Sequence, residues 1–292
     1  MDNFSVYLQT KGPLIESALD RYLPLSTREP TALHRCMRYS ATGGKRLRPL
    51  ITLGVAEMLG CDAERVLPTC AAIEFIHTHS LILDDLPCMD NDDFRRGRPT
   101  SHRQFGESIA LLAADALLNL AICLLGTNHR LAGIPPETAL DIIREVGETV
   151  GTDGVIGGQM ADLAFLPSSE VTATILERIH VDKTARLFRL SARAGALIAQ
   201  AKPAQLEGVG AYAERLGLAF QIVDDLLDHA DGKSDASNRS GVEPSYARSY
   251  SPLVARDLAV EATSRALDSL SRFGEEARVL RALARYNLER AS

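Results

Sequence analysis

Two groups of aspartates lie 140 residues apart in a chain whose pattern is otherwise apolar and helical. The first group is Asp84, Asp85 and Asp90, and the second is Asp224, Asp225 and Asp228. Neighbouring carboxylates raise each other's pKa and resist ionising together unless a cation answers their charge. Clusters of carboxylate oxygens select hard divalent ions, Mg²⁺ above all, which keep several waters and share their coordination with phosphate oxygens. The two groups therefore predict a site for metal-bound phosphate.

The second group has the spacing of one helix face. Asp224 and Asp228 are four residues apart, so on a helix they point the same way, with Asp225 beside them. A solvated acidic turn is the alternative interpretation. However, apolar residues at 218–223 precede the group and Leu226-Leu227 follow, which favours carboxylates set in a buried helix that share a metal ion.

The first group is less regular, because Asp84 and Asp90 are six residues apart and a straight helix would not bring them together. Pro87 removes a backbone donor and disturbs the helix, so we expect residues 86–89 to form a bulge that returns Asp90 to the metal. Asp92, Asp93, Arg95 and Arg96 follow, a mixture that a salt-bridge patch at a helix end would also produce.

Cations and small polar residues recur elsewhere in forms that suit an anion. Residues 43–49, GGKRLRP, place flexible glycines before three cations, which can present donors to an anion without steric cost. His77 lies about two helical turns before Asp84. Gly157-Gly158-Gln159 would let two helices approach closely and offer an amide to the interior. A further predicted helix carries His180, Lys183 and Thr184. These residues together describe a deep helical cavity with charged groups at its mouth.

The elements that must position these residues are helices. Apolar residues recur at helical spacing, as in 204–227, and alternating strand patterns with hairpin turns are missing. We expect an all-α, single-domain bundle (1–292) of roughly ten or more helices around a deep central cavity. Helix breaks are predicted at 43–44, 60–62, 133–136, 151–158, 167–169 and 231–252. The last of these, polar and long, is expected to be a surface loop.

Composition excludes several classes of protein. The net charge is −6 and basic residues form no run, so a nucleic-acid surface is not expected. Five cysteines without a CxxC pair favour a reduced, cytoplasmic setting, and the first residues lack the features of a signal or transit peptide. Residues 108–126 are apolar enough to suggest a membrane span, but Asp115 and Asn119 favour a buried central helix and no stable membrane insertion.

The ordered motifs resemble those of the trans-type polyprenyl diphosphate synthases, a family of all-α isoprenoid chain-elongating enzymes. The resemblance covers almost the whole chain. It runs through GGKRLRP (43–49), the segment 74–102 with DDLPCMD, GGQMADL (157–163), HVDKTARLF (180–188) and FQIVDDLLD (220–228). Four residues between the first aspartate pair and the next aspartate are familiar in the short-chain enzymes that make farnesyl or geranylgeranyl diphosphate.

This resemblance implies a role for each motif residue. Asp84, Asp85, Asp90, Asp224, Asp225 and Asp228 would hold several Mg²⁺ ions, with Mn²⁺ as an alternative, on an allylic diphosphate (dimethylallyl, geranyl or farnesyl). Arg95 and Lys183 would join that anion, with Gln221 and Thr184 close by. Lys45, Arg48, His77 and Arg96 would bind isopentenyl diphosphate. A homodimer is also implied.

His79, five residues before Asp84, stands where the family commonly sets product length. Its intermediate bulk favours farnesyl to geranylgeranyl length. The chain also departs from the family pattern. Residues 248–252 read RSYSP where relatives have a KTTYP-like segment, only Lys233 remains of the loop lysines, and Ala185 and Ala114 replace glycines. We expect these departures to affect loop closure and turnover more than the fold.

Two other functions fit part of the pattern. A regulatory subunit that pairs with a catalytic homologue would tolerate the altered 231–252 loop, but it would not need two intact aspartate motifs. An isoprenoid cyclase also ionises diphosphates with helical aspartates, yet it has no second diphosphate for GGKRLRP to bind. The sequence therefore favours a prenyltransferase.

Overall fold

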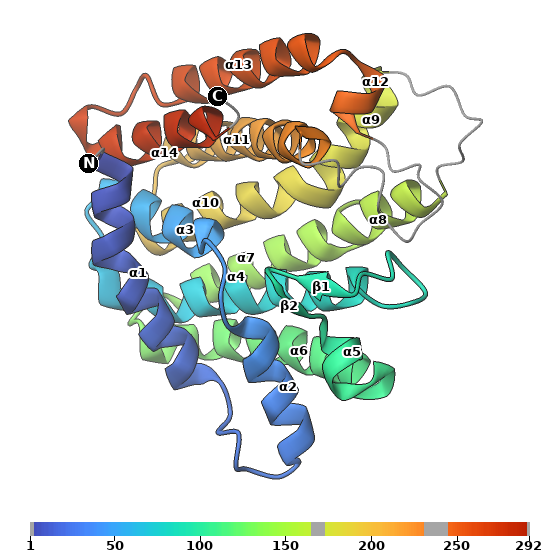
Figure 1. Cartoon of the computed structure of the whole chain (residues 1–292). Helices are drawn as coiled ribbons and strands as arrows, with labels where there is room; N and C mark the ends of the chain where they lie inside the picture. Colours follow the sequence, from blue (N-terminus) through green and yellow to red (C-terminus); the bar gives the residue numbers. More distant parts are fainter. Residues whose placement is uncertain (1–2, 165–172, 231–244, 291–292) are drawn as a thin grey trace.

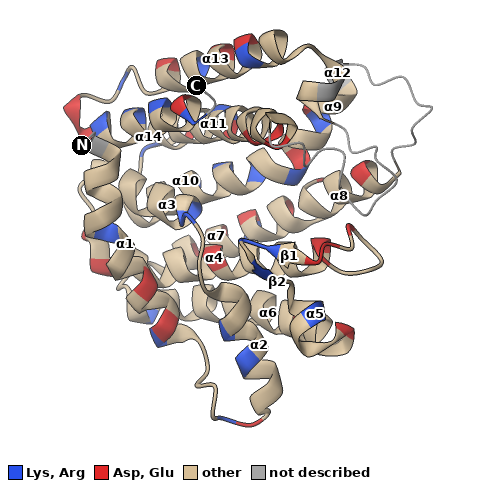
Figure 2. Ribbon diagram, viewed as in Figure 1, with Lys and Arg blue, Asp and Glu red and all other residues tan. Residues whose placement is uncertain are grey.

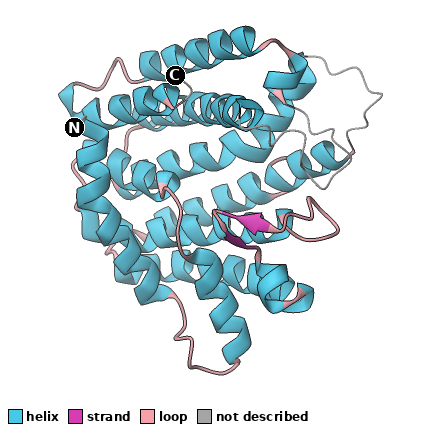
Figure 3. Cartoon of the chain, viewed as in Figure 1, coloured by secondary structure: helices cyan, strands magenta, loops and turns pink. Residues whose placement is uncertain are grey.

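The computed structural model describes residues 3–164, 173–230 and 245–290, and most of them are helical (Figures 1 and 3). In the first half the helices are α1 (Asn3–Tyr22), α2 (Thr31–Ala41), α3 (Leu47–Met58), α4 (Ala63–Asp84), α5 (Ser101–Phe105) and α6 (Glu107–Leu131). Next come α7 (Pro136–Val150), α8 (Val155–Leu163), α9 (Ala173–His180), the π-helix η1 (Val181–Ala185), α10 (Arg186–Ile198) and α11 (Pro203–Ala230). The last are α12 (Tyr246–Ser249), α13 (Pro252–Ser269), the 3₁₀ turn η3 (Glu275–Ala277) and α14 (Arg278–Glu289). The all-α prediction is confirmed.

One short β-hairpin interrupts the helices of the described chain. Strands β1 (Phe94–Arg95) and β2 (Arg98–Pro99) pair in antiparallel fashion. The two residues between them, Arg96 and Gly97, have positive φ values of 55° and 73°, which suits the tight turn of a two-residue hairpin. The sequence does not predict this element, because strands of two residues are too short to show an alternating pattern.

Helix α4 lies at the centre of the molecule. It packs against α1, α3, α6 and α10, and it is apolar on all sides, as expected for a helix that neighbours surround. Asp62 caps its first turn by accepting a hydrogen bond from the Glu64 amide at 3.3 Å. The helix ends at Asp84, so the fold places the first aspartate group at the end of its central element.

The second aspartate group is carried by α11, the longest helix of the described chain. The first part of α11 packs on α10 within the main apolar core, and the C-terminal part packs on α13 in a smaller, separate apolar cluster. Members of this smaller cluster include Leu218, Ile222, Val223, Tyr246, Ala255 and Ala259. Helix α10 contacts both α4 and α11, and so it separates and orients the two aspartate-bearing helices.

Most predicted helix breaks coincide with real ends. The segments 42–46, 59–62 and 132–135 all separate helices. The break predicted at 151–158 is wrong in its second half, because α8 begins at Val155 and includes both Gly157 and Gly158. Residues 167–169 and 231–244 lie outside the described residues. Beyond them, α12 and the start of α13 occupy most of a stretch predicted to be loop.

Two helices, α4 and α6, are long and apolar enough to cross a membrane by length and composition alone. They differ in burial, since 78% of the apolar window of α4 but only 39% of that of α6 is buried. Helix α6 therefore corrects the prediction of a buried central helix at 108–126. Its outer face leaves Leu111, Leu112 and Ile122 exposed.

The five cysteines are all free thiols. Cys36 and Cys70 are buried, whereas Cys88 and Cys123 are exposed.

Candidate active site

A cavity of about 720 Å³ opens between the end of α4, the start of α3, β1, η1 and α11. Its lining is mainly charged. The acids are Glu74, Asp84, Asp90, Asp92, Asp224 and Asp228, and the bases are Lys45, Arg46, Arg48, His77, Arg95, Arg96 and Lys183. The apolar lining residues are Leu47, Leu81, Leu187 and Phe220. The fold thus brings both aspartate groups to one cavity, and mainly charged residues line the mouth of that cavity. Figure 2 shows acidic positions toward one end of α11 and in the turn next to the basic strand β1.

The first aspartate group folds back on itself at the end of α4. The helix stops at Asp84, and the chain then turns so that the Asp90 amide donates to the Asp84 carbonyl at 2.8 Å. Asn91, at φ 54°, completes the turn. The predicted return of Asp90 is therefore present. It is made by a turn after the helix and not by a bulge within it.

Asp85 is bound by a cation of the protein. Arg95 donates to Asp85 Oδ1 from Nε at 2.9 Å and from Nη2 at 2.5 Å, and Nη2 also reaches Asp92 Oδ2 at 3.0 Å. Asp85 is 4% exposed and does not line the cavity. Its place is beside Arg95, which it orients. Asp93, for its part, forms an ion pair with Arg103, so part of this run is the salt-bridge patch that the sequence allowed.

In the second group, too, two aspartates line the cavity and one does not. Asp224 and Asp228 line the cavity, whereas Asp225 accepts hydrogen bonds from Gln221 Nε2 at 2.9 Å and from the Tyr246 amide at 2.8 Å. Burial raises the pKa of Asp225 to about 7. The bond from the Tyr246 amide to Asp225 fixes the start of α12 (Tyr246–Ser249) onto α11.

Asp84 needs a cation that the protein only partly supplies. Burial raises its pKa to about 6, while the charge of Lys183 acts in the opposite direction. The Lys183 ammonium donates to Asp162 Oδ2 at 2.8 Å, and the charges of Asp84 and Asp162 outweigh its burial and raise its pKa. A permanent cation therefore stands between α8 and the first aspartate group.

The basic residues of the GGKRLRP segment face the cavity from the start of α3 and from the residues just before it. Arg48 stacks over the Phe188 ring at 4.7 Å and contacts His77 Nε2 at 3.1 Å. Burial, and then the charge of Arg48, hold the pKa of His77 well below its ordinary value, so a neutral His77 accepts this bond. Lys45 is exposed and lies over the Phe220 ring at 5.9 Å.

Arg96 is held by the glycines that precede Lys45. Its Nη1 donates to the Gly43 carbonyl at 2.6 Å, and a Cβ on Gly44 would lie 2.6 Å from the same nitrogen. Gly44 also has a φ of 116°, which side chains rarely adopt. Only glycine lets the two basic segments approach so closely, so their cations are presented together.

The π-helix η1 carries Lys183 and Thr184 at the other side of the cavity. The Thr184 hydroxyl donates to Gln221 Oε1 at 2.9 Å, which joins η1 to the second aspartate group through the Gln221–Asp225 bond. Gly158 of α8 packs against this turn, because a Cβ there would lie 2.5 Å from the Lys183 amide nitrogen. The predicted close approach of helices at Gly158 is confirmed.

His79 lies below the first aspartate group, between α4 and α6. It is 7% exposed, and its Nδ1 donates to the Ala114 carbonyl of α6 at 3.0 Å. It is not among the residues that line the cavity mouth. His180, also predicted near the site, stacks on Tyr246 behind Asp225 and does not line the cavity either.

Three residues of the site were given no role from the sequence, although Asp162 and Glu74 lie within motifs quoted above. Arg290 donates to Asp224 Oδ1 at 2.6 Å and lies 5.1 Å over the Phe220 ring. Asp162 binds Lys183, and Glu74 faces the basic residues. Each contact joins positions far apart in the chain, so spacing along the sequence gives no hint of it.

The donor set fits a hard divalent cation shared with phosphate. Asp84, Asp90, Asp224 and Asp228 offer carboxylate oxygens to one cavity. Among the described residues no three His, Cys, Asp or Glu side chains converge closely enough to hold a metal ion by themselves. Mg²⁺ does not need such a cage, since it keeps several waters and takes substrate phosphates as ligands. The residues therefore fit Mg²⁺ held jointly with a diphosphate.

The comparison with known proteins agrees with this geometry. A family model described as polyprenyl synthetase matches residues 30–242. The chain belongs to the polyprenyl synthetase family. The resemblance inferred from the ordered motifs is thereby confirmed.

Relatives of this polyprenyl synthetase include short-chain enzymes from plants and bacteria. The chloroplastic geranylgeranyl pyrophosphate synthase of Capsicum annuum is 36% identical over 291 residues, which are 97% of this chain and 78% of that protein. Large subunit 1 of the heterodimeric geranylgeranyl pyrophosphate synthase of Arabidopsis thaliana is 40% identical over 242 residues, 82% of this chain and 65% of that protein. The crystal structure of an FPP/GFPP synthase from Zymomonas mobilis superposes with a TM-score of 0.87 at 35% identity, covering 98% of this chain and 99% of that one. These similarities support the interpretation of this polyprenyl synthetase as a short-chain trans-prenyl diphosphate synthase.

Proposed function

We propose that this polyprenyl synthetase condenses isopentenyl diphosphate with an allylic diphosphate to form a longer trans-prenyl diphosphate and releases diphosphate. The observation that carries the proposal is the shared cavity, in which aspartates from the end of α4 and from α11 meet cations from the GGKRLRP segment and from the β1–β2 hairpin. The acids suit a diphosphate that brings metal with it, and the cations suit a second diphosphate that binds without metal. A cyclase would have no use for the second set.

The aspartates and two cations would receive the allylic substrate. Asp84, Asp90, Asp224 and Asp228 would hold Mg²⁺, or Mn²⁺ in its place, which when bound neutralises the diphosphate and eases its departure. Asp85 acts through Arg95, and Asp225 acts through Gln221. Arg95 and Lys183 add positive charge directly to the leaving diphosphate. The carbon–oxygen bond breaks, the electron pair stays on the diphosphate, and an allylic cation remains.

Lys45, Arg48, His77 and Arg96 would bind the diphosphate of isopentenyl diphosphate. Its double bond then attacks the allylic cation to form the new carbon–carbon bond, and the proton that leaves the adduct passes to the departing diphosphate. The apolar Leu187 and Phe220 help to keep water away from the cation. No side chain needs to act as a general base.

Other parts of the proposal concern the whole protein. The outer face of α6 supports a homodimer, since the exposed apolar side chains of Leu111, Leu112 and Ile122 on one helix suit an interaction surface. We further propose that residues 1–292 form one domain and that the enzyme is cytoplasmic, with products of farnesyl to geranylgeranyl length. His79, wedged between α4 and α6, would set that length.

The test is a product assay. Purified protein with MgCl₂, isopentenyl diphosphate and dimethylallyl, geranyl or farnesyl diphosphate should release diphosphate and yield a longer prenyl diphosphate on chromatography. Primer that binds but stays unchanged would point to a regulatory subunit. Conversion of the primer to a cyclic hydrocarbon without consumption of isopentenyl diphosphate would point to a cyclase.

A further inference from the structure

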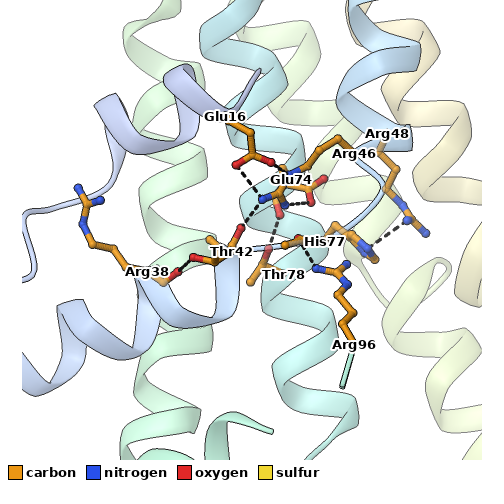
Figure 4. A network of polar contacts seen from close by, with 11 residues as sticks. Glu16, Arg38, Thr42, Arg46, Arg48, Glu74, His77, Thr78 and Arg96 are labelled. Carbon is orange, nitrogen blue, oxygen red and sulfur yellow. Dashed lines mark hydrogen bonds and ion pairs between the residues drawn. The ribbon is translucent and has the colours of Figure 1, made fainter. Parts of the chain in front are cut away.

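Arg46 is the one cation of the GGKRLRP segment to which no role has been given, and it has the most extensive set of contacts among the three. Its guanidinium is 3% exposed and pairs with Glu16 of α1 through two bonds, from Nε at 2.6 Å and Nη2 at 3.1 Å. Nη1 donates to Glu74 Oε1 of α4 at 2.6 Å, and Nη2 also donates to the Ala41 carbonyl at 2.7 Å. Figure 4 shows this network. Arg46 thus joins α1, α2 and α4 at one point.

The backbone of Arg46 is held in an uncommon conformation. Its φ of 53° lies in the left-handed region, immediately before α3 begins at Leu47. A non-glycine residue there costs free energy and persists only where surrounding contacts determine it. The bonds to Glu16, Glu74 and Ala41 are such contacts. They fix the direction in which the chain enters α3, and hence where the flanking residues Lys45 and Arg48 project.

The same network extends to His77, Arg48 and Arg96, which are also proposed to bind isopentenyl diphosphate. Glu74 is 2% exposed and lies one helical turn before His77, which contacts Arg48 at 3.1 Å. Burial lowers the pKa of the Arg48 and Arg96 guanidinium groups, and the charge of Glu74 opposes that shift in both. One buried carboxylate therefore serves as a counter-charge to several cations of the basic cluster.

We propose that Arg46 is a positioning residue for isopentenyl diphosphate. Clamped between Glu16 and Glu74, it orients Lys45 and Arg48 on one side and keeps Glu74 as the shared counter-charge of the basic cluster on the other. Arg46 itself does not touch the substrate. Donors that are already oriented need no reorganisation when the diphosphate arrives, so the clamp favours binding. The inference rests on the proposed function, because it assigns the cluster to isopentenyl diphosphate.

The decisive variant is Arg46→Met, which keeps an unbranched apolar stem and removes every hydrogen bond of the guanidinium group. The KM for isopentenyl diphosphate should rise by about tenfold to 100-fold, since misplacement of positioning groups by about 1 Å can cost about 100-fold. The KM for the allylic primer should stay within about twofold, because the aspartates, Arg95 and Lys183 are not part of the clamp. Arg46→Lys, which keeps a cation near Glu74 but loses the fork, should recover part of the affinity.

Arg193→Met is the matched control. Arg193 forms a comparable two-bond pair with Glu145, at 2.8 and 2.5 Å, between α10 and α7 and away from the cavity lining. This variant should lower the melting temperature and leave both KM values unchanged. A rise in both KM values for Arg46→Met, or a lower melting temperature with an unchanged KM for isopentenyl diphosphate, would show that Arg46 only stabilises the fold and would overturn the proposal.

Two further measurements keep the test decisive. If Arg46→Met does not fold, Glu16→Gln replaces it, since Glu16 is 52% exposed and its loss leaves the Glu74 pair intact. The KM of Glu16→Gln for isopentenyl diphosphate should rise about threefold with an unchanged primer KM. No change in either KM would overturn the proposal.

Calorimetric titration with isopentenyl diphosphate alone measures binding without turnover. Wild-type protein that binds it but does not elongate a primer would defeat the proposed function and leave the clamp standing.

Discussion

At the scale of single residues, the six aspartates divide into two kinds. Asp85 and Asp225 are occupied by protein donors, namely Arg95 for the first and Gln221 and the Tyr246 amide for the second. Asp84, Asp90, Asp224 and Asp228 instead line the cavity, and Asp224 also accepts a hydrogen bond from Arg290. The sequence could not separate the two kinds, because all six have the same chemistry and only the folded chain shows which of them line the cavity.

The cavity-facing aspartates should be the most sensitive to substitution. We expect Asp84→Ala and Asp224→Ala each to lower kcat by about 100- to 1,000-fold, the scale of losing one group that stabilises developing charge. Asp93→Ala, which removes an exposed pair with Arg103, is the control and should stay near the wild-type rate. Circular dichroism checks that the fold is retained. Near-normal kcat for Asp84→Ala in a steady-state assay would contradict the metal assignment.

Metal affinity should depend on pH in a defined direction. The pKa of Asp84 is raised to about 6, so in the absence of metal the folded protein holds more protons than the unfolded chain between about pH 4 and 6, and this group's contribution to stability falls as the pH rises through that window. Magnesium competes with those protons. MgCl₂ with diphosphate should therefore raise the melting temperature more at about pH 8 than at about pH 5.5. Equal shifts at both values in differential scanning fluorimetry would argue against the prediction.

His79 offers a test of product length. The ring fills the space between α4 and α6 and is fixed by its bond to the Ala114 carbonyl. His79→Ala should therefore open space below the first aspartate group and shift the products toward longer chains by one or more isoprene units. His102→Ala, which removes a buried histidine near α5, is the control and should not change the product distribution. Identical chromatograms for His79→Ala and wild type would remove His79 as the length determinant.

At the scale of elements, the contact between α8 and η1 determines where Lys183 lies. Gly158→Ala places a Cβ 2.5 Å from the Lys183 amide nitrogen, so the π-helix must shift. We expect kcat to fall by about tenfold or more, since small displacements of positioning groups are costly. Gly126→Ala in α6 is the matched helical control, because its Cβ would meet only Ile143 Cδ1 at 3.8 Å. The measurement is the steady-state kcat of Gly158→Ala and of Gly126→Ala. Equal kcat values would mean that η1 tolerates the shift.

The sequence predicted helices well and their irregularities poorly. Long apolar periodicity located α11, and glycine or proline located most of the breaks. It did not predict η1, because the residues of a π-turn are those of an ordinary helix and the irregularity comes from packing against Gly158. The hairpin at β1 and β2 was missed for a similar reason, since the contacts of Arg95 and Arg96 across the fold hold it in place.

At the scale of the whole molecule, the exposed face of α6 makes a prediction about assembly. Sedimentation should give about twice the chain mass of 31.7 kDa. Leu112→Glu, at a position 58% exposed on α6, should yield monomers, because a buried unpaired charge is costly at an interface. Leu253→Glu on α13, at a position 71% exposed, should leave the dimer intact. A monomeric wild-type protein would contradict the proposed homodimer.

The division of the interior into two apolar clusters has a consequence for heating. The end of α11 that carries Asp224 and Asp228 belongs to the smaller cluster with α13, whereas Asp84 ends a helix of the larger core. Regions with less buried apolar surface open at a lower free-energy cost than the rest of a protein. Thermal inactivation should therefore begin below the temperature of global unfolding. Asp224 and Asp228 would lose their positions relative to Asp84 while most helices remain intact.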